Sequence, residues 1–389
     1  MNILLINYEY PPIGGGAATA TAAIAGHLAS LGHAVTVLTS GFRDLRGNIR
    51  EGDVHVVRCP AIRRRPERSG ILEMLSYLFS AGLMLGSVIR ERQIEASIVF
   101  FSFPCGPLGL WGLKRENVPY VISLRGGDVP GNEAALATLH RMLKPLRRLI
   151  FRRSVAVVAN SPGLKEMSER ADPWPVRVIP NGVDTDFFCP SENRNTTEQP
   201  QQRPFVFLFV GRFQVQKNLF YLIHQAASLK HSGVGPFALH FVGDGPQRDE
   251  LYHYSKMQGI EDDLVWHGWV SKDRLREIYR SADCLVNPSL YEGMPNVVLE
   301  AVSCGLPVIA SRVAGNDTVV RDGETGRLFK LDDPEAFQAA LREMIADPER
   351  AKKMGQKGLA WVREEFSWRR VAQAYADLFP CLTREISRI

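Results

Sequence analysis

Short apolar runs recur along the whole chain, and stretches with helical composition separate them. Most runs are apolar from end to end, which is typical of strands that helices cover on both faces of a parallel sheet. The runs form two series, first at 2–7, 34–39, 54–59, 96–101, 119–124, 155–160 and 176–180, and then at 205–211, 238–244, 264–269, 284–289 and 306–311. Two such sheets predict an α/β chain of two Rossmann-like domains.

The length of 389 residues favours the same division, because one hydrophobic core rarely serves so long a chain. A polar segment at 189–204, CPSENRNTTEQPQQRP, separates the two series and has almost no large apolar residue. We interpret this segment as a linker or long exposed loop. The predicted domains are therefore 1–188 and 205–365.

Composition is that of an ordinary soluble protein, with 45% hydrophobic and 23% charged residues. The six cysteines, at 59, 105, 189, 284, 304 and 381, form no CxxC pair and no histidine-flanked cluster. This spacing favours a reduced, cytoplasmic location and argues against a zinc site or a disulfide framework. The start of the chain, MNILLINYEYPP, has no positively charged region and indicates a first strand rather than a secretion signal.

Positive charge is concentrated in the first half of the chain. Residues 1–180 hold 22 lysines and arginines against 14 acidic residues, whereas residues 181–389 hold 25 against 28. The excess gathers at 63–65 and at 140–153, where cations alternate with large apolar residues. This pattern suits peripheral contact with an anionic membrane or a phosphorylated partner, and a solvated helix face is the alternative. Nucleic acid is disfavoured because no recognised binding module accompanies the charge.

One apolar segment, 71–89, is just long enough to cross a bilayer. Glu73 lies within it, as do several serines and glycines. We expect a buried or interfacial helix rather than a membrane span.

Two carboxylates, Glu292 and Glu300, flank seven uncharged residues in the stretch YEGMPNVVLEA. In a continuous helix eight residues advance about 12 Å, which is too far for two acids to share a proton. A glycosidase pair would lie within roughly 5 to 10 Å. The two acids are therefore expected to hold separate parts of one long ligand, unless they are solvated surface glutamates.

The residues between the two acids predict the start of a helix. Gly293 and Pro295 suit a helix entrance, and the helix is expected to run from Asn296 to Cys304. The backbone N–H groups of a helix N-terminus form a ready site for phosphate. The order acid, anion site, acid predicts contacts with a sugar, a diphosphate and a ribose in succession.

Further motifs follow the predicted strands at their carboxyl ends, where open α/β sheets bind ligands. The first strand precedes PPIGGG, with Gly15 and Gly16 at its end. The first strand of the second series precedes GRFQVQKN, which supplies Gly211, Arg212 and Lys217, and VGDGP with Gly243 follows the next strand. Each motif alone could be a turn, but the two cations stand where a diphosphate needs neutralising.

At these residues the chain resembles the family 4 retaining glycosyltransferases of the GT-B fold. The resemblance extends over nearly the whole sequence and is carried by VANSPGL (158–164), VIPNGVDTDFF (178–188), VGRFQVQKN (210–218), FVGDGP (241–246), NPSLYEGMPNVVLEAVSCGLPVIAS (287–311), DGETGRLF (322–329) and FSWRRVAQAY (366–375). It implies two Rossmann-like domains that face each other across a cleft, and a last helix in 366–389 that crosses back to the first domain.

The resemblance also implies roles for particular residues. Glu300 would hold the ribose hydroxyls of a nucleotide-sugar donor, and Glu292 would contact the donor sugar. Arg212 and Lys217 would neutralise the diphosphate. The backbone of four residues would cap that diphosphate, namely Gly293, Met294, Pro295 and Asn296. Gly15 and Gly16 would approach from the other domain. The implied reaction moves a sugar to a hydroxyl of a glycan or lipid-linked acceptor, in polysaccharide or glycolipid biosynthesis.

Neither a metal nor a cofactor is expected, because the two cations would do the electrostatic work on the leaving diphosphate. The sequence does contain Asp184-Thr185-Asp186, which looks like the metal clamp of another glycosyltransferase fold. Since it lies within the NGVD segment of the resemblance, we interpret it as structural.

One turn departs from the family pattern. Many relatives carry a histidine near the reacting sugar, where this chain reads Leu124-Arg125-Gly126-Gly127-Asp128. Arginine is a poor proton shuttle, so we expect an electrostatic role for Arg125, with Asp128 orienting it. The alternatives are a non-catalytic nucleotide-sugar-binding protein and a nucleotide-sugar epimerase. A dehydrogenase is disfavoured because PPIGGG lacks the spacing of a dinucleotide-binding loop.

Overall fold

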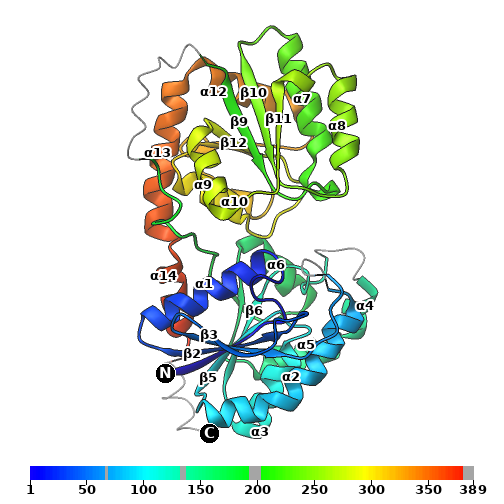
Figure 1. Ribbon diagram of the computed structural model, residues 1–389, viewed down its shortest axis with the longest axis vertical. Helices are drawn as coiled ribbons and strands as arrows, with labels where there is room; N and C mark the ends of the chain where they lie inside the picture. Colours follow the sequence, from blue (N-terminus) through cyan, green and yellow to red (C-terminus); the bar gives the residue numbers. More distant parts are fainter. Residues whose placement is uncertain (66–68, 132–136, 192–202, 380–389) are drawn as a thin grey trace. The chain divides into compact units, whose positions relative to one another are not determined.

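The computed structural model describes residues 1–65, 69–131, 137–191 and 203–379 (Figure 1). The chain divides into two compact units. The first unit joins Met1–Gly182 to the chain from Trp368 onward, and the second unit is Val183–Ser367. Most of the predicted linker 189–204 and the end of the predicted segment 366–389 lie outside the described residues.

The first unit contains an eight-stranded sheet in the order β3-β4-β2-β1-β5-β6-β7-β8. Its strands are β1 (Asn2–Ile6), β2 (Ala34–Ser40), β3 (Gly47–Glu51), β4 (Val54–Cys59), β5 (Ala96–Phe100), β6 (Tyr120–Leu124), β7 (Ala156–Ala159) and β8 (Val176–Val178). All neighbours pair in parallel except β3, which runs antiparallel to β4 at the edge. The sequence did not predict β3, because every residue in it is exposed and the strand lacks an apolar run.

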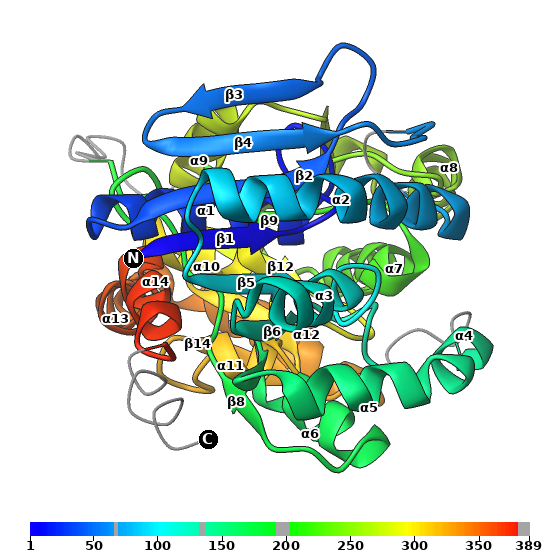
Figure 2. The same cartoon turned by 90° about the horizontal axis from the view of Figure 1, so that it is seen from below.

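The helices of the first unit pack against one another in groups. They are α1 (Gly16–Ser30), α2 (Ile71–Glu91), α3 (Gly106–Glu116), α4 (Ala137–Met142), α5 (Lys144–Arg153), α6 (Pro162–Ala171) and α14 (Trp368–Ala376). Helix α2 packs against α3, and α3 packs against α5, so these three form one layer (Figure 2). Helix α14, which comes from the end of the chain, packs against α1.

The second unit contains a six-stranded parallel sheet in the order β11-β10-β9-β12-β13-β14. Its strands are β9 (Phe205–Val210), β10 (Phe237–Val242), β11 (Leu264–Gly268), β12 (Cys284–Asn287), β13 (Val308–Ser311) and β14 (Gly326–Phe329). Its helices are η3 (Val215–Lys217), α7 (Leu219–His231), α8 (Arg248–Met257), η4 (Glu261–Asp263), α9 (Lys272–Ser281), α10 (Asn296–Ser303), α11 (Asn316–Val319), α12 (Pro334–Ala346) and α13 (Pro348–Glu365). Two Rossmann-like units with mostly parallel sheets confirm the predicted α/β fold class.

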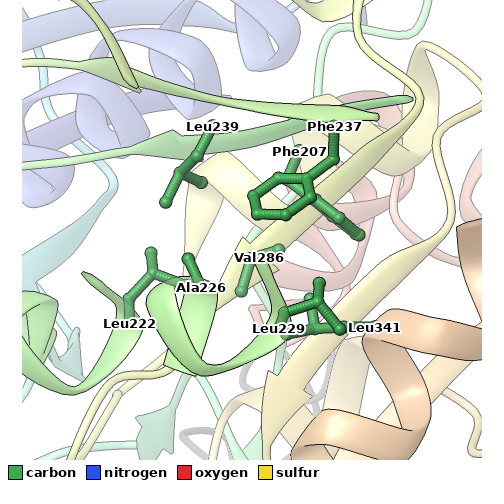
Figure 3. Close-up of a pocket in the computed structure, with 8 residues that line it drawn as sticks. All are labelled: Phe207, Leu222, Ala226, Leu229, Phe237, Leu239, Val286 and Leu341. Carbon is green, nitrogen blue, oxygen red and sulfur yellow. The ribbon is translucent and has the colours of Figure 1, made fainter. Parts of the chain in front are cut away.

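A small cavity lies inside the hydrophobic core of the second unit (Figure 3). Its lining consists of Phe207, Leu222, Ala226, Leu229, Phe237, Leu239, Val286 and Leu341. All eight side chains are apolar and offer no group that could recognise a polar ligand. This cavity is a packing feature of the core and not a candidate binding site.

The boundary between the units lies earlier than the predicted end of the first domain at 188. The backbone N–H of Val183 donates to the carbonyl of Phe366 at 2.7 Å, which ties residue 183 to the second unit. Phe188 packs edge-on against Tyr279 with 5.8 Å between the ring centroids. Gly182, on the other side of the boundary, approaches Trp368 so closely that a Cβ there would lie 2.7 Å from the Trp368 nitrogen.

Among the described helices, α2 is the one that is long and apolar enough to cross a membrane. One side of α2 belongs to the core of the first unit, where Tyr77, Ala81 and Leu85 are buried. The hydroxyl of Tyr77 donates to the carbonyl of Leu38 in β2 at 2.9 Å. Helix α2 is therefore anchored to the sheet along one face.

Candidate active site

Two loops of the second unit are joined at the carboxyl end of its sheet. The loop after β9 contains Gln216, and the loop after β12 contains Leu290 and Tyr291. The N–H of Leu290 donates to the Gln216 carbonyl at 2.8 Å, and the Gln216 side-chain amide donates to the Tyr291 carbonyl at 2.8 Å. Strands β9 and β12 are neighbours in the sheet, so the predicted motifs at their ends come together.

Lys217 and Glu292 form an ion pair at this junction. The Lys217 Nζ lies 2.6 Å from Glu292 Oε1, and only 13% and 7% of the two side chains are exposed. The hydroxyl of Ser289 donates to the same carboxylate oxygen at 2.7 Å, and the Asn287 amide donates to it at 3.4 Å. Three donors thus converge on one oxygen of Glu292, which fixes the carboxylate in place.

A buried layer of polar side chains lies behind this ion pair. The Asn287 amide donates to Asn316 Oδ1 at 2.9 Å, and the Asn316 amide donates to the Ser311 carbonyl at 2.9 Å. The hydroxyl of Ser311 in turn donates to the Ser289 carbonyl at 2.5 Å. These residues were not predicted from the sequence. The polar endings of the apolar strands, Asn287 after CLV and Ser311 after VIA, were the available signal.

Glycines let the loops of this region approach one another. A Cβ on Gly243 would lie 2.0 Å from the carbonyl oxygen of Gly211, and Gly243 has a φ of +130°. A Cβ on Gly315 would lie 2.6 Å from the Gly293 carbonyl oxygen. The first contact brings the loops after β9 and β10 together, and the second brings together the loops after β12 and β13, at the strand ends where such loops meet.

Helix α10 begins beside this group and carries Glu300. It runs from Asn296 to Ser303, one residue shorter than predicted, with Pro295 as its N-cap. Pro295 makes no side-chain capping hydrogen bond to the first turn, and the N-terminal backbone of α10 has the character of an anion site. Met294, next to the N-cap, is buried in the core of the unit.

Glu300 is partly exposed and is hydrogen-bonded to a buried tyrosine. The Tyr279 hydroxyl donates to Glu300 Oε2 at 3.0 Å. Burial raises the pKa of Glu300 to about 7, and the hydrogen bond from Tyr279 acts in the opposite direction. A carboxyl with this pKa changes its charge near neutral pH.

Arg212 contrasts with Lys217, although both follow β9. Its side chain is exposed, and among the described residues it has no hydrogen-bond or ion-pair partner. Its guanidinium is thus available to an external anion, whereas Lys217 is already paired with Glu292.

The described contacts of the Arg125 side chain lie within the first unit. Its guanidinium is buried in the first unit, where Nη1 donates to Asn181 Oδ1 at 2.6 Å and Nη2 to the Tyr375 hydroxyl at 3.4 Å. The same group lies over the ring of Phe100 at 4.7 Å. These contacts connect β6 to the segment before the unit boundary and to α14. Arg125 is thus engaged in a structural network.

Asp128 holds the turn that follows β6. Its carboxylate accepts from the backbone N–H groups of Ser102, Arg125 and Gly126 at 2.7, 2.9 and 3.2 Å. Burial raises the pKa of Asp128, and these backbone hydrogen bonds oppose that effect. Its contacts are those of a carboxylate that shapes a loop.

Gly15 and Gly16 also belong to the first unit, as the N-cap and first residue of α1.

The Asp184-Thr185-Asp186 segment has a local structural contact. Asp184 Oδ1 accepts from the backbone N–H of Phe187 at 3.0 Å, and Asp186 is exposed. Within the described ranges, no three histidine, cysteine or acidic side chains gather as a metal site would require.

The two halves of the chain match two glycosyltransferase family models. Residues 14–187 match Glycosyltransferase Family 4, and residues 191–361 match Glycosyl transferases group 1. Together these matches cover both sequence series except the first run at 2–7, and they include Lys217 and Glu292.

Three known proteins illustrate the similarity. The lipopolysaccharide core biosynthesis glycosyltransferase LpsE of Rhizobium meliloti (strain 1021) is 30% identical over 70% of this chain and 79% of that protein. The UDP-Gal:alpha-D-GlcNAc-diphosphoundecaprenol alpha-1,3-galactosyltransferase of Escherichia coli is 35% identical over 45% of this chain and 46% of that protein. The solved sucrose-phosphate synthase of Thermosynechococcus elongatus superposes with a TM-score of 0.83 at 23% identity, over 99% of this chain and all of that one.

The structural likeness concerns the fold, and the sequence matches extend it to the family. The chain therefore belongs to glycosyltransferase family 4 and has the GT-B fold.

Proposed function

We propose that this glycosyltransferase takes a sugar from a nucleotide-diphosphate sugar and transfers it to a hydroxyl of a glycan or lipid-linked acceptor, with retention of the anomeric configuration. The observation that carries the proposal is the junction in the second unit. There Lys217 and Glu292 are paired beside the N-terminus of α10, and Glu300 lies further along the same helix.

Each part of the donor has a matching group at this junction. The Glu300 carboxylate accepts hydrogen bonds from the two ribose hydroxyls, and Tyr279 orients it from behind. The first turn of α10 and Arg212 bind the diphosphate. Glu292, held by Ser289 and Asn287, contacts the sugar. Lys217 lies against Glu292 and is positioned to neutralise the phosphate nearest the sugar.

The chemical step breaks the bond between the anomeric carbon and the diphosphate oxygen and forms a bond from that carbon to the acceptor oxygen. The acceptor attacks from the side on which the diphosphate leaves, and its proton passes to the departing phosphate oxygen. Lys217, Arg212 and the α10 N-terminus stabilise the charge that develops on the diphosphate. Loss of such a preorganised donor typically costs about 10²- to 10³-fold in rate.

No metal is part of this proposal. In this proposal Arg212 and Lys217 neutralise the diphosphate in place of a divalent ion. The contact of Asp184 with the Phe187 backbone supports a structural role for the Asp184-Thr185-Asp186 segment.

For the acceptor and the location, we propose a lipid-linked or glycan hydroxyl at the cytoplasmic face of a membrane. The name of the similar Escherichia coli galactosyltransferase describes a diphosphoundecaprenol acceptor, and that of LpsE describes lipopolysaccharide core biosynthesis. The excess of cations in residues 1–180 supports the same location.

The test is incubation of the full chain with a panel of nucleotide sugars, without added metal and then with a chelator. Slow release of the free nucleotide, accelerated by a lipid-linked acceptor, is the expected result. Interconversion of the sugar on the nucleotide would instead support an epimerase, and binding without any turnover would support a non-catalytic protein. Loss of turnover in the chelator would contradict metal independence.

Matched variants identify the site in the same assay. Glu292→Gln is expected to abolish turnover, whereas Glu277→Gln, on α9, is expected to leave it unchanged. Thermal shift with the same nucleotide sugars measures binding separately from turnover, because a saturating ligand raises the unfolding temperature.

A further inference from the structure

Helix α2 presents a row of large apolar side chains to solvent. Leu72, Phe79 and Leu83 are 76%, 72% and 71% exposed, and Leu75 lies between them at 44%. The spacing of three, four and four residues places all four on one face of the helix. The opposite face is fixed to the core by Tyr77 and its neighbours, so the helix cannot turn this row inward.

Exposed cations adjoin the start of this row. Arg64 and Arg65 are exposed in the segment that precedes α2. The Arg64 N–H donates to Glu73 Oε1 at 2.8 Å, and the Ile62 N–H donates to the Ser76 hydroxyl at 2.9 Å. The segment 62–64 is thus bound along the first turns of α2. Ile62 adds another exposed apolar side chain next to the row.

The neighbouring helices extend the positive charge across the same layer. Helix α3 packs against α2, and its last turn carries the exposed residues Lys114 and Arg115 before it ends at Glu116. Helix α5 packs against α3 (Figure 2). On α5, Arg152 is exposed, and the exposed Arg148 is paired with the buried Asp172. The apolar row therefore belongs to a helical layer whose exposed charges include several cations.

We propose that the row of Leu72, Leu75, Phe79 and Leu83, together with Arg64 and Arg65, is a docking surface for an anionic lipid bilayer. Helix α2 lies in the plane of the membrane interface. Its apolar row enters the boundary between headgroups and acyl chains, and the arginines bind anionic headgroups. A span across the bilayer is excluded by the buried face of the same helix.

A second copy of the chain fits this surface less well than lipid. The row is one helix wide, whereas a stable protein interface buries about 800 Å² on each partner. Anionic lipid complements both the apolar row and the charge.

This inference rests on the proposed function in one respect: a lipid-linked acceptor explains why docking is useful, because docking brings the enzyme to a substrate held in the membrane. The binding itself needs neither donor nor acceptor. Failure to dock would leave nucleotide binding intact, and docking without transfer would contradict only the proposed function.

The experiment is co-sedimentation of the full chain with vesicles of phosphatidylcholine and phosphatidylglycerol, beside vesicles of phosphatidylcholine alone. We expect binding to the mixed vesicles that weakens with added salt. The variant Leu72→Ser/Phe79→Ser/Leu83→Ser is expected to bind at least about tenfold more weakly. The variant Arg64→Glu/Arg65→Glu is expected to lose the preference for anionic vesicles.

The matched control is Met257→Ser, which removes a similarly exposed apolar side chain from α8 of the second unit. It is expected to bind vesicles as the unmodified chain does. Unchanged thermal unfolding shows that each variant is folded. Equal vesicle binding by the triple variant and the unmodified chain would overturn the proposal. A second outcome would also overturn it. In that outcome the unmodified chain does not bind vesicles, and light scattering finds a dimer that the triple variant does not form.

Discussion

The Lys217 ammonium lies 2.6 Å from the Glu292 carboxylate and thereby joins the loop after β9 to the loop that precedes α10. Both side chains are largely buried, and Glu292 also accepts from Ser289 and Asn287. The pair therefore sets the position of two groups that the proposed reaction uses, before any donor is bound. A donor diphosphate would share Lys217 with Glu292, without requiring the loops to assemble first.

Replacing Lys217 and Glu292 separately and then together should show that their contributions to the unfolding free energy are strongly coupled. Lys217→Met leaves a buried carboxylate without its cation and is expected to cost about 2 to 4 kcal/mol of unfolding free energy. The double variant with Glu292→Gln should lose less than the two single losses combined, by about 1 to 3 kcal/mol. Urea unfolding of the four proteins measures this coupling energy.

The control is the same set of single and double replacements at Lys230 and Asp263, an ion pair nearer the surface. Its Lys230 Nζ lies 2.7 Å from Asp263 Oδ2. Because both side chains are more exposed, its coupling is expected to stay below about 1 kcal/mol. Equal coupling in the two pairs would contradict a special role for burial at Lys217 and Glu292.

Arg212 should matter for donor binding and not for stability. Since its guanidinium has no partner among the described residues, Arg212→Ala is expected to change the unfolding free energy by less than about 0.5 kcal/mol. Donor affinity, measured by calorimetry, should fall at least about tenfold, because a charge-assisted contact to the diphosphate is lost. Arg363→Ala, which removes an exposed arginine from α13, should alter neither quantity.

Glu300 should make stability depend on pH. Its pKa is raised from 4.5 to about 7 in the folded chain, so the folded state binds more protons than the unfolded state between these values. The contribution of Glu300 favours folding most below pH 4.5 and is lost as the pH rises through about 7. Glu300→Gln removes this dependence. The unfolding free energy of Glu300→Gln minus that of the unmodified chain should therefore be larger at pH 8 than at pH 5. The expected change in this difference is on the order of 2 kcal/mol.

Urea unfolding at the two pH values tests this prediction, and Glu277→Gln on α9 is the control that should show no such trend. A difference between Glu300→Gln and the unmodified chain that is the same at both pH values would show that the Glu300 pKa is not raised.

Gly243 should tolerate no side chain. A Cβ would lie 2.0 Å from the Gly211 carbonyl oxygen, and the φ of +130° is unfavourable for other residues. Gly243→Ala is expected to cost about 3 kcal/mol or more, because the loops after β9 and β10 would separate. Gly235→Ala is the matched control, since nothing lies within 4 Å of its Cβ position. Thermal unfolding compares the two, and equal effects would contradict the close approach of the loops.

Arg125 should act through stability. Arg125→Ala removes the donor that Asn181 and Tyr375 share, and it is expected to cost about 2 to 4 kcal/mol of unfolding free energy. Tyr375→Phe should cost less, because Arg125 keeps its contact with Asn181. Arg115→Ala, at an exposed position in α3, is the control. If Arg125→Ala unfolds at the same urea concentration as the unmodified chain, its structural network contributes little.

Local sequence signals predicted most strands and the start of α10. Buried parallel strands have continuous apolar runs, and a proline at a helix entrance has a local cause, so both can be recognised within a few residues. Strand β3 was missed because an exposed edge strand has no apolar run. Strand β14 was missed because four residues that begin with glycine give little periodicity.

Contacts between distant residues set the limit of the sequence analysis. The partners of Arg125 include Tyr375, which lies 250 positions away in the sequence, and a local motif cannot reveal such a partner. Helix α2 gives a second example. Its composition showed an apolar helix, but only packing against the sheet decides which side stays in solvent.

The chain leaves the first unit after Gly182 and returns to it at Trp368, and Val371, Ala372 and Tyr375 then complete the core of that unit. On the ribosome, Trp368–Ala376 is made only after the second unit has been synthesised. The first unit therefore obtains this part of its core after the chain of the second unit is already available to fold.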